Sequence, residues 1–172
     1  MNDKELINLQ RYIGKRSKGE SDSDVISHIV KLNSSHEITQ DEWGKLLFIA
    51  CANCDITILE YILSKLMTLN NPNDYIKHTL GFRNVAVGYE EKQVMVIKRL
   101  FSYVLPQERN QVLNDALVQA VWFGEYESVK YLLDQGADLS YQSNGRSMIE
   151  LAQNAVIKFN DHRVEKLILL NG

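Results

Sequence analysis

"ALVQAVWFGEYESVKYLLDQGADLS", residues 116–140, carries two helical patterns separated by a glycine, and this stretch decides the fold. Apolar residues recur at three- and four-residue spacings on both sides of Gly124, which is the period of an α-helix. Gly136 follows the second pattern, and a residue just past a helix end often takes a left-handed conformation that side chains disfavour. We therefore predict a short helix, a tight turn and a second helix, with the chain turning again at Gly136.

The same outline recurs along the chain. Residues 46–66, "LLFIACANCDITILEYILSKL", align with residues 116–136 at an offset of 70. The aligned pairs include Leu47 with Leu117, Ala50 with Ala120, Tyr61 with Tyr131, and Leu63 with Leu133. Residues 85–104 give a similar outline between them, and residues 144–152 with 164–172 give a further one. A recurring period of this kind predicts a stack of equivalent helical units, here four.

Small and apolar side chains explain why such units would stack. Ala50, Ala120 and Ala152 lie where neighbouring hairpins come together, and a larger residue there would overpack by about 1–3 kcal/mol. The second helix of each unit carries an apolar side that one hairpin cannot cover alone, so a neighbouring hairpin must cover it. The residues on that side are Ile62, Leu63, Leu100, Leu132, Leu133, Ile168 and Leu169.

This pattern resembles the ankyrin repeat, a unit of about 33 residues with a turn and two antiparallel helices. The match is strongest for "GEYESVKYLLDQGADLS" (124–140) followed by "NGRSMIELA" (144–152). The resemblance implies an all-α solenoid of stacked helix-turn-helix repeats, with about four repeats in residues 43–172. Residues 1–42 are then an N-terminal helical cap or a degenerate repeat, and we expect one domain spanning residues 1–172.

The sequence departs from the family pattern in three ways. Only one loop, within "ADLSYQSNG" (137–145), keeps the finger that normally projects between repeats. Pro72 and Pro106 are placed to start longer helices, because proline is tolerated in the first helical turn. The final unit carries about four extra residues after Ala152, which predicts a lengthened helix or an inter-helix loop around "IKFND".

Composition excludes several classes of partner. The chain has 172 residues and a formal net charge of −3, which gives no attraction toward nucleic acid or anionic membranes. The start of the sequence lacks a secretory signal, and its most apolar stretch is too short to span a bilayer. Two cysteines do not make a disulfide framework. We expect a cytoplasmic protein, with delivery into a host cell left open.

The one motif that suggests chemistry is "CANC", with Cys51 and Cys54, because C-x-x-C serves redox exchange and zinc binding. In the alignment both residues occupy positions that require small side chains, and Cys54 falls where the other unit has Gly124. No second cysteine pair and no H-x-x-x-H spacing supplies further zinc ligands. We therefore expect no metal, no cofactor and no catalysis, and keep a thiol- or metal-dependent enzyme as the rival hypothesis.

The resemblance also implies where a partner would bind. In ankyrin repeats the residues at the end of the first helix line the binding groove, and Trp122 and Phe123 stand two and three residues after Ala120. Aromatic residues dominate interface energetics, so these two are the principal candidates. Transfer of the same positions adds Ala52, Asn53, Tyr89, Glu90 and Asn154, and the finger adds Tyr141, Gln142 and Asn144.

These features predict a non-catalytic module that binds a protein partner through a groove, as a bacterial effector or an adaptor would. A self-associating scaffold is the alternative, because the last helical pattern, "VEKLILLNG" (164–172), is apolar for a terminal repeat, which normally has a polar outer face. The identity of the partner is open at this point.

Overall fold

A computed structural model describes residues 3–14, 21–81 and 88–172 of the chain. These described residues form ten α-helices and one short 3-10 helix, with no β-strand beyond one isolated bridge. The predicted all-α fold class is therefore confirmed. The chain divides into two compact units, Met1–Asn71 and Pro72–Gly172, and each is described by itself.

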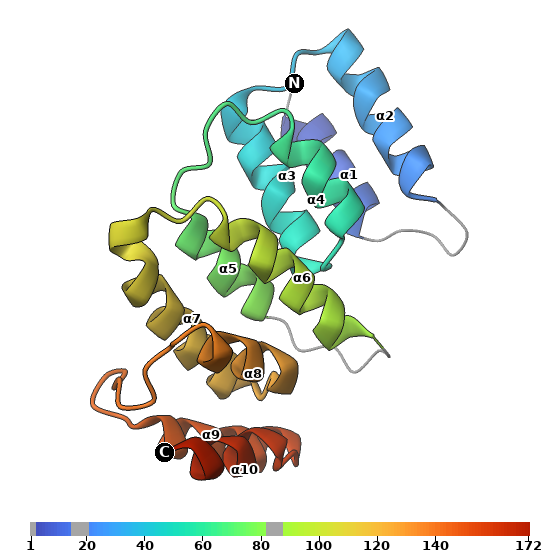
Figure 1. The fold of residues 1–172 in the computed structure, drawn as a ribbon. Coiled ribbons are helices and arrows are strands. Elements are labelled where there is room, and N and C mark those ends of the chain that lie inside the picture. The colour runs from blue at the N-terminus through green and yellow to red at the C-terminus, as the bar shows by residue number, and fades with distance from the viewer. Residues whose placement is uncertain (1–2, 15–20, 82–87) are drawn as a thin grey trace. The chain divides into compact units, whose positions relative to one another are not determined.

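The described residues of the first unit form four helices, and a capping side chain opens three of them. They are α1 (Asp3–Gly14), α2 (Asp22–Ser35), α3 (Gln40–Ala52) and α4 (Ile56–Leu63) (Figure 1). Ser21 and Thr39 cap α2 and α3 through reciprocal capping boxes, and Asp55 caps α4. Helix α3 forms a hairpin with α4, α1 packs on α3, and α2 packs on α4. The predicted helices in the first 42 residues are thus present.

The described residues of the second unit form three helical hairpins, which pack on one another in chain order (Figure 1). Its helices are α5 (Pro72–Leu80), α6 (Tyr89–Phe101), η1 (Pro106–Glu108), α7 (Arg109–Phe123), α8 (Tyr126–Asp134), α9 (Met148–Phe159) and α10 (Arg163–Asn171). The first helices pack in the order α5, α7, α9, and the second helices in the order α6, α8, α10. Each hairpin therefore contributes one helix to each of two rows.

The hairpins α3–α4 and α7–α8 share one turn geometry. Cys54 and Gly124 both have positive φ, 51° and 69°. The following N–H groups of Asp55 and Glu125 donate to the carbonyl oxygens of Ala50 and Ala120, at 3.0 and 2.9 Å. This pattern is a Schellman motif, in which a left-handed residue lets the last carbonyls of a helix find donors. The two stretches aligned in the sequence thus turn in the same way.

The packing positions agree with the sequence pattern, with one exception. Ala50, Ala120 and Ala152 are each 0% exposed. Of the apolar residues predicted to line the second helices, Ile62, Leu63, Leu100, Leu132 and Ile168 are buried and Leu133 is intermediate. Leu169 is 66% exposed, so its predicted place in the core is wrong: the neighbouring Ile168 takes the buried position on α10.

Three predicted departures have definite outcomes. Helix α9 runs on to Phe159, so the extra residues after Ala152 lengthen the helix. Pro72 begins α5 as predicted, but that helix has only nine residues. Pro106 begins the 3-10 helix that leads into α7, a helix of 15 residues. The prediction that residues 85–104 form a whole hairpin is wrong. The described part of this range holds α6, and the first helix of the hairpin is α5. Residues 85–87 lie outside the described residues.

Candidate functional site

The finger, residues 137–147, follows α8 and begins at a third Schellman motif. Gly136 has φ 91°, its N–H donates to Leu133 at 2.9 Å, and the N–H of Ala137 donates to Leu132 at 3.0 Å. The left-handed conformation predicted for Gly136 is confirmed. The chain leaves the helix sharply at this point and enters the finger.

The tip of the finger is a two-residue turn. Asn144 and Gly145 both have positive φ, 52° and 73°, as a type I′ turn requires. Ser143 and Arg146 flank the turn and exchange two backbone hydrogen bonds of 3.0 Å each. Ser147 then caps α9 through a capping box with Glu150. Local sequence alone therefore gives the finger a defined shape, with Arg146 beside its tip.

Helix α7 holds the finger at two places. The N–H of Asp138 donates to Asn114 Oδ1 at 2.8 Å. Farther along the finger, the hydroxyl of Tyr141 accepts from Gln111 Nε2 at 3.1 Å and lies 3.5 Å from Asp115 Oδ1. These polar residues share one face of α7, because they are spaced three and four residues apart.

Asp115 is the centre of this polar cluster. Lys77 Nζ lies 2.7 Å from Asp115 Oδ2, and Asn73 Nδ2 and Gln111 Nε2 donate to its carboxylate at 3.0 and 2.8 Å. Burial raises the pKa of Asp115, but the hydrogen bonds from these three residues outweigh burial and hold the pKa below its ordinary value. The carboxylate thus connects α5, α7 and the finger in its charged form.

An open groove of about 430 Å³ lies beside α7 and the finger. Its lining residues are Val118, Gln119, Trp122, Phe123, Ser143, Asn144, Arg146 and Leu151. The first four continue the face of α7 that holds the finger, one to three turns farther along the helix. Trp122 and Phe123 are half-buried, so each ring retains surface that a ligand can contact. We name this the finger groove.

Two cations accompany the two aromatic rings. The guanidinium of Arg146 lies 5.9 Å from the centre of the Trp122 ring. Lys158 Nζ, from α9, lies 5.3 Å from the centre of Phe123 and 4.9 Å from that of Phe159. Such contacts place positive charge on a ring face at little cost in hydration when the cation is exposed. Both cations are exposed.

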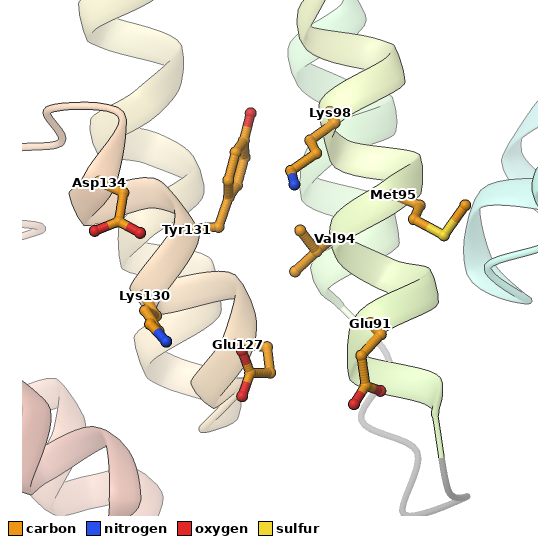
Figure 2. A pocket seen from close by; sticks show the side chains of 8 residues that line it. All are labelled: Glu91, Val94, Met95, Lys98, Glu127, Lys130, Tyr131 and Asp134. Atoms are coloured by element: carbon orange, nitrogen blue, oxygen red, sulfur yellow. The ribbon is translucent and has the colours of Figure 1, made fainter.

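A second groove, of about 370 Å³, lies between α6 and α8 (Figure 2). Its lining residues are Glu91, Val94, Met95, Lys98, Glu127, Lys130, Tyr131 and Asp134. In Figure 2, Lys98 reaches toward Tyr131 and Met95 points away from α8; Lys98 Nζ lies 5.1 Å from the Tyr131 ring centre. Its lining has three carboxylates and two lysines. It belongs to the row of second helices, whereas the finger groove belongs to the row of first helices.

The structure brings three of the predicted contact residues together, namely Trp122, Phe123 and Asn144. Tyr141 and Gln142 lie in the finger outside the lining of the groove: Tyr141 turns back onto α7, and Gln142 is exposed. Asn154 is exposed on α9. Ala52 and Asn53 lie at the end of α3 in the first unit, where Asn53 Nδ2 reaches the carbonyl of Ile13 at 3.5 Å.

The predicted groove positions of Tyr89 and Glu90 are wrong. Both residues begin α6, after the left-handed Gly88, whereas Trp122 stands before the corresponding turn. Tyr89 is 6% exposed and belongs to the core. Glu90 accepts hydrogen bonds from the N–H of Glu127 and from Arg163, at 3.1 and 2.8 Å, and so connects the three second helices of this unit.

The sequence reasoning missed the other lining residues of the finger groove. Val118 stands four residues before Trp122, and Gln119 stands four residues before Phe123, so the helical repeat could have identified them. Arg146 stands opposite Ser143 across an Asn-Gly turn, a dipeptide that signals a hairpin. Lys158 had no such signal, because its contact with Phe123 depends on the lengthened α9.

Cys51 and Cys54 are buried, 0% and 2% exposed. The thiol of Cys54 donates to the carbonyl of Cys51 at 3.6 Å. Reactive cysteines are at least partly exposed, whereas buried structural cysteines are inert. Within residues 3–14, 21–81 and 88–172, no group of three or more His, Cys, Asp or Glu side chains is placed to hold a metal ion. In the same ranges, none of the helices has both the length and the hydrophobicity needed to cross a bilayer.

Comparison with protein-family models, with curated proteins and with solved structures finds no match for this chain.

Proposed function

We propose that this chain is a non-catalytic protein-binding module built from ankyrin-like helical hairpins, with the finger groove as its partner site. The observation that carries the proposal is the meeting of Trp122, Phe123 and Asn144 in one open groove. Trp122 and Phe123 end α7 and Asn144 lies in the finger, and the sequence pattern predicts all three as contact residues.

The repeated geometry of the hairpins supports the ankyrin-like part of the proposal. The turns at Cys54 and Gly124 match in backbone conformation and hydrogen bonding. The finger has a β-turn at its tip and precedes a first helix that opens with a capping box. Each trait belongs to a repeat in which a turn is followed by two antiparallel helices.

The chemistry of the finger groove favours protein recognition. Interface centres are enriched in tryptophan, tyrosine and arginine, and this groove has Trp122 and Arg146 in contact. Its walls are held by hydrogen bonds between α7 and the finger, so little ordering is required on binding. The groove between α6 and α8 is less suited, because most of its lining residues are charged and charged residues are depleted at interface centres.

The test is affinity capture followed by titration of the purified partner. The variants are the Trp122/Phe123 double alanine chain and, as a matched control, the Met95/Lys130 double alanine chain, which alters the other groove. We expect the first to lose capture of a protein that wild type and the control retain. Trp122→Ala alone should weaken the binding of that partner by about 2 kcal/mol or more. Equal capture by all three chains would contradict the proposal.

Self-association is a second candidate, favoured by one observation. Ile157, Leu169 and Leu170 are 84%, 66% and 84% exposed, on the two last helices. Light scattering across a range of concentrations tests this candidate. A mass that rises with concentration in wild type and not in Leu170→Glu would support it, and a monomer at every concentration would contradict it.

A further inference from the structure

The finger groove carries positive charge in a chain whose net charge is negative. Arg146 is the single charged residue in its lining, and Lys158 adds a second cation over Phe123. Neither cation is held by a carboxylate ion pair in the part of the chain that is described, and their contacts are with aromatic rings. Their charges are therefore accessible to a ligand.

The carboxylates on α7, the finger and α9, which supply the lining of the groove, are already engaged. Glu150 accepts hydrogen bonds from the N–H and the hydroxyl of Ser147 at 2.7 and 2.8 Å. These hydrogen bonds and, to a smaller extent, the charge of Arg146 lower the pKa of Glu150. Asp138 accepts from the N–H and the hydroxyl of Ser140, at 2.8 and 2.7 Å. Asp115 is held by Lys77. None of the three lines the groove.

We propose that the finger groove binds an acidic peptide segment of a partner protein, one that places an apolar or aromatic side chain on Trp122 and a carboxylate on Arg146. This inference rests on the proposed function and specifies the partner's chemistry. A guanidinium is well suited to a carboxylate because it can donate two parallel hydrogen bonds. The exposed part of the indole ring beside it supplies apolar contact area.

Charge complementarity distinguishes this partner from the alternatives. A basic segment would meet Arg146 and Lys158 with like charge and lose affinity. A nucleic acid requires a broad basic surface, since its affinity comes from many phosphate contacts, and the chain as a whole is negative. The groove between α6 and α8 has three carboxylates and two lysines in its lining, so its net charge is negative and does not favour an acidic segment.

The test begins with selection from a displayed library of random 12-residue peptides on the immobilised full chain, with Trp122→Ala used for counter-selection. We expect the selected peptides to be enriched in Asp or Glu next to an aromatic residue or leucine. A labelled peptide from this set is then compared with its twin, in which every Asp and Glu is replaced by Asn and Gln. Fluorescence anisotropy gives the dissociation constants of both.

Arg146→Gln should weaken the affinity for the acidic peptide on the order of tenfold. The affinity for the amide twin, which is already lower, should stay nearly unchanged. Lys158→Gln should act in the same direction, and Lys130→Gln, a matched loss of charge in the other groove, should have no effect. Arg146→Glu should select basic peptides in place of acidic ones. Circular dichroism checks that each variant is folded.

Two failures are distinguishable. Trp122-dependent peptides without acidic enrichment, or an equal effect of Arg146→Gln on both twins, would overturn the proposed partner chemistry and leave the binding groove in place. If no selected peptide depends on Trp122, both this inference and the proposed function are overturned.

Discussion

Cys54 and Gly124 hold the same left-handed position in two helical hairpins. Their φ angles are 51° and 69°, and each N–H donates to the residue three positions earlier at 3.1 Å. Glycine takes this conformation without strain, whereas a residue with a side chain does so at some cost. Cys54 is buried, as Gly124 is, so its small side chain belongs to the core of the first unit. This assigns a packing role to one cysteine of the C-x-x-C motif.

Gly136→Ala should lower the free energy of unfolding by about 1 kcal/mol, because the left-handed backbone would then carry a side chain. A Cβ at Gly136 would meet no atom within 4 Å, so the loss would come from the backbone alone. Urea unfolding followed by circular dichroism measures it. Gly14→Ala is the control: Gly14 is the last residue of α1, its new Cβ would make an ordinary 3.5 Å contact with Ile49, and stability should not fall. Equal losses at both sites would contradict this reading.

Ala120→Leu should destabilise the second unit by about 1–3 kcal/mol, since α7 packs between α5 and α9 and the alanine side chain is 0% exposed. Asn154→Ala, an exposed change on α9, should leave stability within about 0.5 kcal/mol. Thermal unfolding of both variants compares them. An Ala120→Leu chain as stable as wild type would show that small size at this position does not set the helix spacing.

Much of the fold follows from the sequence because its causes are local. The turn at Gly136 requires only a helix end and a glycine, and the period of apolar residues fixed which side of each second helix is buried. Trp122 was identified because its position relative to Ala120 depends on one helix. Tyr89 was placed wrongly because the number of residues between α5 and α6 differs from that between the two helices of the other hairpins. Arg146 reaches Trp122 only through the finger, so their contact is a tertiary feature.

Gln93 and Ser128 form a buried polar pair that tests how α6 packs on α5 and α8. Gln93 Nε2 donates to the carbonyl of Thr79, one of the last four of α5, and Gln93 Oε1 accepts from the Ser128 hydroxyl at 2.7 Å. Ser128→Ala should cost about 1–3 kcal/mol by leaving that oxygen without a donor. A double-mutant cycle with Gln93→Leu should give a total loss smaller than the sum of the single losses. Strict additivity would contradict direct coupling.

Asp115→Asn should destabilise the second unit at neutral pH, because the charged carboxylate is bonded to Lys77, Asn73 and Gln111. A carboxyl group whose folded pKa is depressed stabilises the fold above its unfolded pKa, about 3.9, and loses that effect as pH falls through the folded pKa. The difference in unfolding free energy between wild type and variant should therefore be constant from pH 7 to about 5 and shrink below about 4. Urea unfolding at several pH values measures it. Asp41→Asn, which removes an exposed partner of Lys45, should show little change. A difference for Asp115→Asn that grows toward low pH would contradict the assignment.

Fluorine NMR of the chain labelled with 5-fluorotryptophan tests the binding groove most directly, because the chain has two tryptophans. Trp43 is 3% exposed in the first unit, whereas Trp122 is half-buried in the finger groove. Trp122→Phe assigns the two resonances. On saturation with a bound partner or a selected peptide, we predict that the Trp122 resonance shifts and the Trp43 resonance stays in place. Complete binding without a shift of the Trp122 resonance would contradict the account.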